Sequence, residues 1–156
     1  MDVSTFYTLF KFLHVTAAIV WIGGACAISL LNVLLARQQQ GPTLAALAQA
    51  SGLYGRLVIG PSVLLTLAAG IGMVVTAGLD ASSLWIVWGL IGLAGSFVMG
   101  AVLSRRLADQ VTALAATAPS SDARLVALQR RLTTLNALNL LLLLSVVWAM
   151  IAKPTL

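Results

Sequence analysis

The chain has 156 residues, of which 60% are hydrophobic and only 8% are charged, and its net charge is +5. With a mean hydropathy of +1.03, this composition excludes an ordinary soluble domain and indicates an integral membrane protein whose main partner is the lipid bilayer. The basic residues stand at the ends of apolar segments and form no patch interleaved with aromatic residues, so nucleic acid is not expected as a partner.

Four apolar segments are long enough to cross a membrane. A helix needs about 20 apolar residues to cross roughly 30 Å of hydrocarbon, and the segments that meet this requirement are about 6–36, 56–78, 83–104 and 133–152. We therefore predict an all-α fold, a four-helix transmembrane bundle that forms a single integral membrane domain over residues 1–156. Arginines gather in or beside the connections between the first and second and between the third and fourth segments. The positive-inside rule then predicts that these connections are cytoplasmic and that both termini lie outside.

The first segment contains the single histidine of the chain, His14. An ionisable side chain inside a membrane span is costly and marks a functional site by default. At about 100° per residue, His14 shares one face of the helix with Tyr7, Ala18, Trp21, Ala25 and Asn32. We expect this polar, aromatic and small-residue face to point into the bundle. The lone Cys26 excludes an intramolecular disulfide, and we expect it to be a small buried residue.

The second segment combines an early proline with several glycines. Pro61 closely follows Arg56, and near the start of a helix a proline is tolerated. Further along, Gly60, Gly70 and Gly72 predict that a neighbouring helix approaches closely. We therefore expect this segment to pack tightly against another span.

The third segment begins after a polar turn and carries a ridge of small residues. Its helix has candidate N-cap residues in Asp80, Ser82 and Ser83. Within the helix, small residues recur at four-residue spacing, and they are Gly92, Ser96 and Gly100. We predict that this ridge packs against a neighbouring helix or against a second copy of the chain, which makes a homo-oligomer an expected assembly.

The last two helices are expected to continue beyond the membrane. After residues 105–106 the pattern is that of an amphipathic helix, and the Ser-Ser-Asp run at 120–122 can start a helix that ends near Lys153. Helices 3 and 4 then extend into a cytoplasmic hairpin. Inside the fourth span, Asn136 and Asn139 are expected to form interhelical hydrogen bonds.

Three side chains that can ligate a metal share a layer beneath the predicted outer surface. His14 lies about 35 Å along its helix from Arg37, which puts it in the outer part of the membrane. Met73 shortly precedes the outer turn, and Met150 shortly precedes the end of the fourth helix. Imidazole with thioether suits haem iron or copper(I), and Lys11, about one turn above His14, suits an anionic group at the rim. The alternatives are that both methionines fill packing gaps and that His14 makes a structural hydrogen bond.

The four segments lack the residues of other common membrane chemistries. They contain no acidic residue, no second histidine and no glycine loop of phosphate-binding form. Hydrolysis, zinc catalysis and carboxylate-driven proton pumping are therefore not expected. Redox cofactor binding is the enzyme-like function that stays open.

The run Lys11-Phe12-Leu13-His14, followed by Trp21-x-Gly23-Gly24, resembles the opening helix of an uncharacterised bacterial family of small predicted integral membrane proteins. That family is itself similar to the copper-resistance protein D family and, distantly, to HemJ-type protoporphyrinogen oxidases. The resemblance implies a multi-pass protein of the bacterial inner membrane. It also implies either copper uptake or haem b chemistry, with His14 as a candidate ligand. Because the chain has no second intramembrane histidine, any second axial ligand would come from Met73, Met150 or another subunit.

Three functional hypotheses follow. The first is a haem b or metal site built on His14, with Lys11, Trp21, Met73 and Met150 nearby, used in electron transfer or redox chemistry. The second is transport of copper or a small solute along the face that contains His14, Trp21 and Asn32. The third is a membrane assembly or scaffold protein with no cofactor, in which the small-residue ridge forms the interface.

Overall fold

Every element in the described part of the protein is helical. The computed structural model describes residues 2–37, 50–117, 119 and 122–154. The elements are α1 (Val3–Arg37), η1 (Gly55–Ile59), α3 (Gly60–Ala77), α4 (Leu84–Phe97), η2 (Val98–Ser104), α5 (Arg105–Ala115) and α6 (Ala123–Ala152). The all-α prediction is therefore confirmed for these residues.

Four continuous helical stretches have the length and the apolar composition needed to cross a membrane. They are Val3–Leu34, Ala50–Ala77, Leu84–Ala115 and Ala123–Ala152. The prediction of four helices long and apolar enough to span a membrane is thus confirmed, although each helix extends beyond its predicted apolar window at one or both ends. The helices run on because a hydrogen-bonded backbone can continue past the hydrocarbon boundary, where polar side chains take over the surface.

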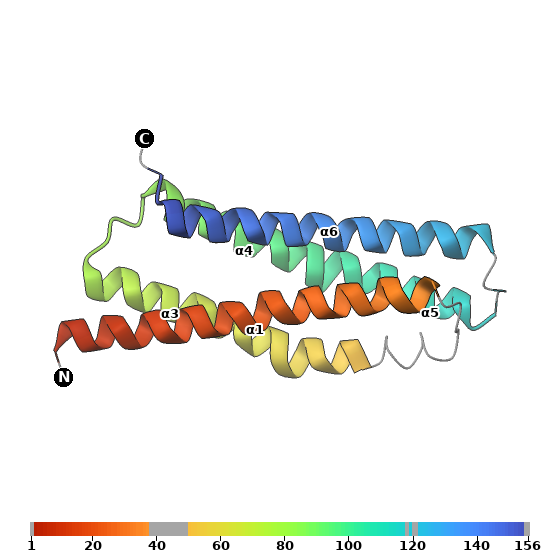
Figure 1. Cartoon of the computed structure of the whole chain (residues 1–156), viewed down its shortest axis with the longest axis horizontal. Helices are drawn as coiled ribbons and strands as arrows, with labels where there is room; N and C mark the ends of the chain where they lie inside the picture. The colour runs from red at the N-terminus through yellow and green to blue at the C-terminus, as the bar shows by residue number, and fades with distance from the viewer. Residues whose placement is uncertain (1, 38–49, 118, 120–121, 155–156) are drawn as a thin grey trace.

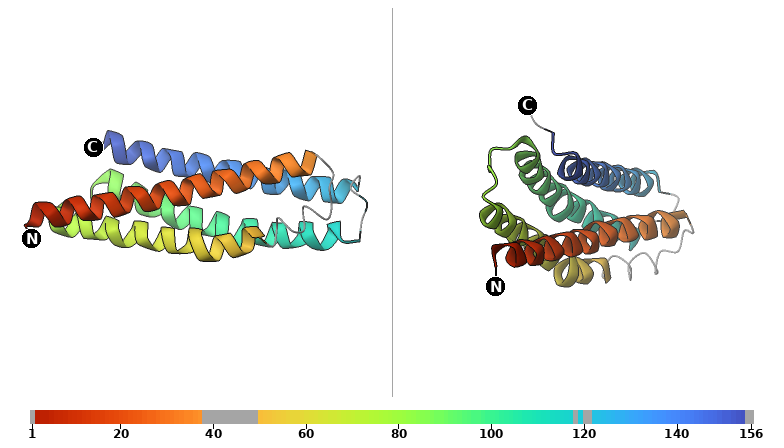
Figure 2. Two further views of the ribbon diagram at one scale, coloured as in Figure 1. Left: turned by 60° about the horizontal axis from the view of Figure 1, so that its bottom comes forward. Right: turned by 60° about the vertical axis from the view of Figure 1, so that its left-hand side comes forward.

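The helices form two antiparallel pairs (Figure 1). α1 packs along α3, whereas α4, η2 and α5 pack against α6. The two pairs meet where α1 contacts α6, whereas among the described residues no Cα atom of α3 lies within 8 Å of a Cα atom of α4 or α6. The right-hand view in Figure 2 shows the same side-by-side pairing. The start of α1 and the end of α6 lie at the same end of the bundle.

Two π-helical segments interrupt the spans without breaking them. The first, η1, ends where the backbone N–H of Gly60 donates to the carbonyl of Gly55. Pro61 then occupies the first turn of α3. Because proline has no N–H to donate, the wider turn just before it keeps the second span continuous. The helical stretch already begins at Ala50, so Pro61 lies inside the span and not, as the sequence suggested, near its start.

The helix ends use local hydrogen bonds. α3 ends at Gly78, whose φ of 59° is left-handed and whose N–H donates to the carbonyls of Val74 and Val75. α4 begins after Ser83, which makes no side-chain capping bond. The carboxylate of Asp122 caps α6 by accepting from the N–H groups of Arg124 and Leu125. Asp122 itself is therefore the N-cap of α6.

The predicted inward face of α1 is confirmed by burial. Trp21 is buried, with 7% of its surface exposed. The other members of the face are half-buried, and these are Tyr7, His14, Ala18, Ala25 and Asn32. Cys26, by contrast, is exposed, so the expectation of burial was wrong for this residue. It points away from the packed face because a change of one position rotates a side chain by about 100°.

The small-residue ridge of the third span packs inside the chain. Gly92 and Ser96 are buried, and a Cβ atom at Gly92 would collide with Val146 of α6. At the adjoining Gly95, a Cβ atom would lie 3.1 Å from Leu142 of the same helix. The prediction of a neighbouring helix is confirmed. Within the single chain α6 therefore covers the ridge at these positions, and a homo-oligomer stays a prediction.

One of the two asparagines in the fourth span forms the predicted interhelical bond. The Ser104 hydroxyl donates to Oδ1 of Asn136 at 2.8 Å. Asn139 lies beside Gly100, where a Cβ atom would be 3.8 Å from its Nδ2. Its Oδ1 is buried without a hydrogen-bond partner among the described residues, so the prediction was wrong for that oxygen.

Candidate functional site

His14 is held against the second span by a single hydrogen bond. Its Nδ1 lies 2.7 Å from the backbone carbonyl oxygen of Thr66 in α3. Because a carbonyl can only accept, Nδ1 carries the proton and donates. In the neutral ring the other nitrogen, Nε2, then keeps its lone pair. No hydrogen bond to Nε2 occurs within the described part of the structure.

The sequence of α3 creates the space for this ring. A Cβ atom at Gly70 would lie 3.2 Å from both Cε1 and Nδ1 of His14, so the glycine lets the imidazole lie directly on the helix. The Thr66 side chain is buried, and its hydroxyl donates to the carbonyl of Ser62 at 2.8 Å. The hydroxyl is therefore satisfied within α3, and the contact with His14 uses the Thr66 backbone carbonyl alone.

A second glycine of α3, two residues further along the helix, faces another aromatic ring. A Cβ atom at Gly72 would lie 2.8 Å from Cδ1 of Phe10. The predicted close approach at Gly70 and Gly72 is confirmed by these two contacts. Together they fix the register of α1 on α3 and hence the position of the His14 ring.

The other predicted site residues lie on different surfaces. Met73 is half-buried on α3, about one turn beyond Gly70. The Met150 side chain instead packs over Gly89 of α4, in the interface between α4 and α6. Lys11 is exposed on α1, one turn before His14, and Trp21 is buried two turns after it. Their roles in binding stay predictions, and the observed contacts of Met150 are packing contacts.

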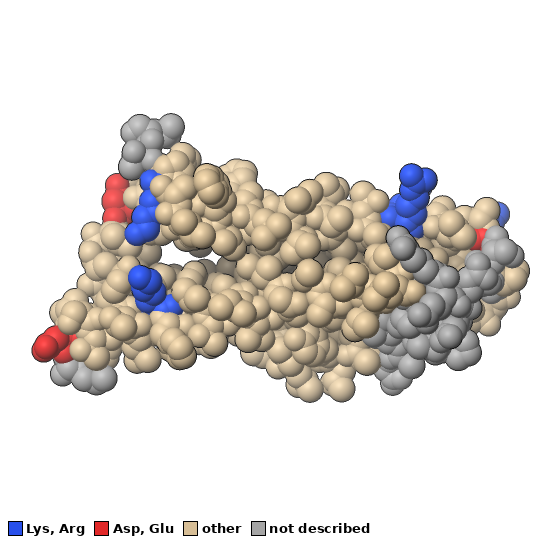
Figure 3. All heavy atoms as spheres, in the orientation of Figure 1, with Lys and Arg blue, Asp and Glu red and all other residues tan. Residues whose placement is uncertain are grey.

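An opening separates the two helix pairs at the end where α1 begins and α6 ends. Figure 3 shows it as a gap between the packed atoms, with basic side chains on both sides. The wide spacing of the backbones agrees with this opening, since no described Cα atom of α3 lies within 8 Å of one in α4 or α6. Lys11 belongs to α1 at this end, and Lys153 follows α6. The ammonium of Lys153 is 5.3 Å from the ring centroid of Trp85, a cation–π distance that ties α6 to α4.

The donors near His14 restrict what the site can bind. Within the described residues, no group of three or more histidine, cysteine or acidic side chains could hold a metal ion. A metal at His14 would therefore take its remaining ligands from thioether, solvent, a second chain or an organic cofactor. Sequence reasoning missed Thr66, because Thr66 contacts His14 through its backbone carbonyl, and every residue type has such a carbonyl.

The chain matches the model of a family described as "Predicted integral membrane protein (DUF2269)" over residues 8–154. The match covers nearly the whole chain, including His14 and its partner Thr66. No curated protein and no solved structure gives a significant match. The expected likeness to an uncharacterised family of membrane proteins is therefore confirmed. The further likeness to the copper-resistance and HemJ-type families stays a prediction.

Proposed function

The chain belongs to the DUF2269 family of predicted integral membrane proteins, and we propose that it holds a redox-active metal cofactor, haem b, on Nε2 of His14. The observation that carries the proposal is the hydrogen bond from Nδ1 of His14 to the Thr66 carbonyl. Histidines that ligate metals characteristically donate their other ring N–H to a carbonyl or carboxylate, which fixes the tautomer and the ring orientation. The same bond in this protein leaves Nε2 as the free nitrogen.

The surroundings of His14 support a cofactor with an apolar body and an anionic edge. The ring is half-buried in an apolar helix pair, and basic side chains lie on both sides of the opening, at the end of the bundle to which Lys11 and Lys153 belong. The carboxylates of a porphyrin would meet these ammonium groups at the boundary with water. Bound haem would supply one-electron chemistry, while the protein positions the iron through His14 and shields it with apolar side chains.

The position of the site within the membrane follows from charge. The arginine-bearing connections are cytoplasmic by the positive-inside rule, so the termini, the opening and His14 belong to the outer half of a bacterial inner membrane. The α5–α6 hairpin then lies on the cytoplasmic side. The expected likeness of the family to the copper-resistance protein D family and, distantly, to HemJ-type proteins favours a metal or porphyrin ligand, and electron transfer is the simplest use of a single-histidine site.

Absorption spectroscopy tests the proposal directly. Protein purified from cells supplied with haem precursor should show a Soret band, and His14→Ala should abolish it. Thr66→Ala is the matched control, because it removes a side chain at the same contact but keeps the carbonyl that orients His14. This control should keep the band.

The metal content distinguishes the remaining outcomes. If the wild-type protein contains stoichiometric copper and shows no Soret band, and if His14→Ala loses the copper, then the metal bound at this nitrogen is copper and not haem iron. Folded wild-type protein that carries neither haem nor copper after expression with both supplied would overturn the proposal.

A further inference from the structure

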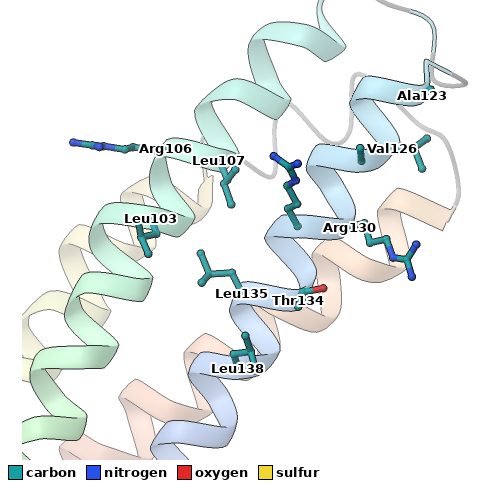
Figure 4. Close-up of a pocket in the computed structure, with 11 residues that line it drawn as sticks. Leu103, Arg106, Leu107, Ala123, Val126, Arg130, Thr134, Leu135 and Leu138 are labelled. Atoms are coloured by element: carbon teal, nitrogen blue, oxygen red, sulfur yellow. The ribbon is translucent and has the colours of Figure 1, made fainter.

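A groove runs between α5 and α6 at the end of the bundle opposite the termini. Its volume is about 960 Å³, and eleven residues from η2, α5 and α6 line it. Figure 4 shows Leu107 and Leu135 pointing toward one another across it. Three arginines also line it, namely Arg106, Arg130 and Arg131. We propose that this groove binds an anionic phospholipid of the surrounding membrane.

The depth of the lining residues matches the two parts of a phospholipid. At 1.5 Å per residue, Arg106 is about 33 Å from the start of α4, and Arg130 is about 33 Å from the end of α6. Roughly 30 Å is the thickness of the hydrocarbon core, so these arginines lie at the level of lipid headgroups. Leu138 lies about 21 Å from the end of α6, well inside the hydrocarbon. The lining is therefore basic at the level of headgroups and apolar at the level of acyl chains. Figure 4 shows Arg106 and Arg130 at the two outer edges of the groove, with side chains that point away from its apolar floor.

The charge of the groove is not neutralised within the chain. Among the described residues, no ion pair joins these three arginines to any of the four aspartates. Asp122, close to the groove in sequence, is engaged with the backbone N–H groups of Arg124 and Leu125. A guanidinium presents a planar fork that fits two oxygens of a phosphate, and basic pockets between transmembrane helices bind anionic headgroups.

Topology alone would not require this arrangement. Arg105 and Arg124 satisfy the positive-inside rule equally well, yet they do not line the groove. The apolar floor between the basic residues is what selects a lipid over a free anion, because an inorganic phosphate has no acyl chain to place there. This inference does not rest on His14, which lies on the other helix pair.

Thermal stability in lipid–detergent micelles tests the proposal. Adding phosphatidylglycerol should raise the Tm of the full-length protein, and phosphatidylcholine at the same concentration should not. The triple variant Arg106→Gln/Arg130→Gln/Arg131→Gln should bind phosphatidylglycerol about 100-fold more weakly, from about fivefold for each arginine near the membrane surface. The double variant Arg105→Gln/Arg124→Gln is the matched control and should respond like the wild type.

Further measurements decide the outcome if the triple variant does not fold. Native mass spectrometry of Arg131→Gln should show about fivefold weaker retention of phosphatidylglycerol, with Arg105→Gln unchanged. An equal increase in Tm with phosphatidylglycerol and with phosphatidylcholine would overturn the proposal. So would an equal loss of phosphatidylglycerol binding in the control variants. Inorganic phosphate that reproduces the full Tm increase would also overturn it, since the site would then recognise an anion and not a lipid.

Discussion

The two helix pairs use glycine in the same way but receive different side chains. In the α4–α6 pair, Gly89 and Gly92 make room for the aliphatic side chains of Met150 and Val146. In the α1–α3 pair, Gly70 makes room for the imidazole of His14. Since van der Waals packing and hydrogen bonds drive helix association in lipid, both arrangements stabilise the bundle. Only the second also brings an ionisable group into the membrane.

The hydrogen bonds between helices also differ between the two pairs. Along α4–α6, Trp88 donates to the Ser145 hydroxyl at 3.2 Å and Ser104 donates to Asn136 at 2.8 Å. These bonds join side chains of two helices and serve packing alone. In α1–α3, the bond from His14 uses one ring nitrogen and orients the other. Within the membrane span, the hydrogen bonds of α4–α6 therefore join helices, whereas the bond in α1–α3 also orients the imidazole on which the proposed cofactor site depends.

Among the substitutions that test this difference between the pairs, we expect the largest loss of stability at Gly92. Gly92→Leu would place a branched side chain where Val146 already packs, and overpacking of this kind costs about 1–3 kcal/mol or more. We expect a marked loss of folded protein in detergent, measured by the Tm and by size-exclusion chromatography. The control is Gly23→Leu, because Gly23 is exposed and a Cβ atom there would meet nothing within 4 Å.

The control should change the free energy of unfolding by less than about 1 kcal/mol. If Gly92→Leu were as stable as Gly23→Leu, the tight packing that defines the α4–α6 pair would be refuted. The same result would return the ridge to consideration as a surface for a second copy.

A smaller and more specific effect is expected at Gly70. Gly70→Ala puts a Cβ atom 3.2 Å from the His14 ring, so the ring must move by a few tenths of an ångström. The cost in stability should stay below about 1.5 kcal/mol. The absorption spectrum of bound haem should nevertheless shift, because the ligand orientation depends on the bond to Thr66.

Gly52→Ala is the matched control on the same span, since a Cβ atom at Gly52 would meet nothing within 4 Å. It should leave the spectrum unchanged. An unchanged spectrum in Gly70→Ala as well would mean that the contact with α3 does not position the ligand.

The sequence predicts the span positions and the glycine contacts because both depend on local composition. Apolar length determines where a helix can cross, and the periodicity of α1 determines which face is packed. It does not determine which helix that face meets. Met150 shares a layer with His14 by depth, yet its side chain packs over Gly89 on the other pair. Depth along a helix carries no information about direction around it.

The features missed by sequence reasoning depend on backbone geometry and on pairwise packing. The Thr66 carbonyl and the π-helical turn before Pro61 leave no mark in residue type. The arginines of the groove can be read from the sequence, but the positive-inside rule alone is enough to explain why they occur there. Only the packing of α5 on α6 shows that Arg106 and Arg131 line one groove.

The smallest expected effect is in the turn that links the two pairs between α3 and α4. Asp80 accepts from the Ser82 N–H at 2.9 Å and from its hydroxyl at 2.8 Å. First the backbone bond and then the hydroxyl bond lower the pKa of Asp80 below its ordinary value of 3.8. A carboxyl group whose folded-state pKa is lowered stabilises the protein above its unfolded pKa, and this contribution disappears as the pH falls through the folded pKa.

Asp80→Asn should therefore lower the Tm slightly at pH 7, and the difference from the wild type should shrink as the pH falls below about 4. Ser82→Ala is the matched control, because it removes the weaker hydroxyl bond and keeps the backbone bond. Its effect should be smaller than that of Asp80→Asn and should shrink over the same pH range. A Tm difference that stayed constant from pH 7 to pH 3 would show that the charge of Asp80 does not stabilise the turn. The two pairs would then be held together by the contacts of α1 with α6 and by the backbone of the turn alone.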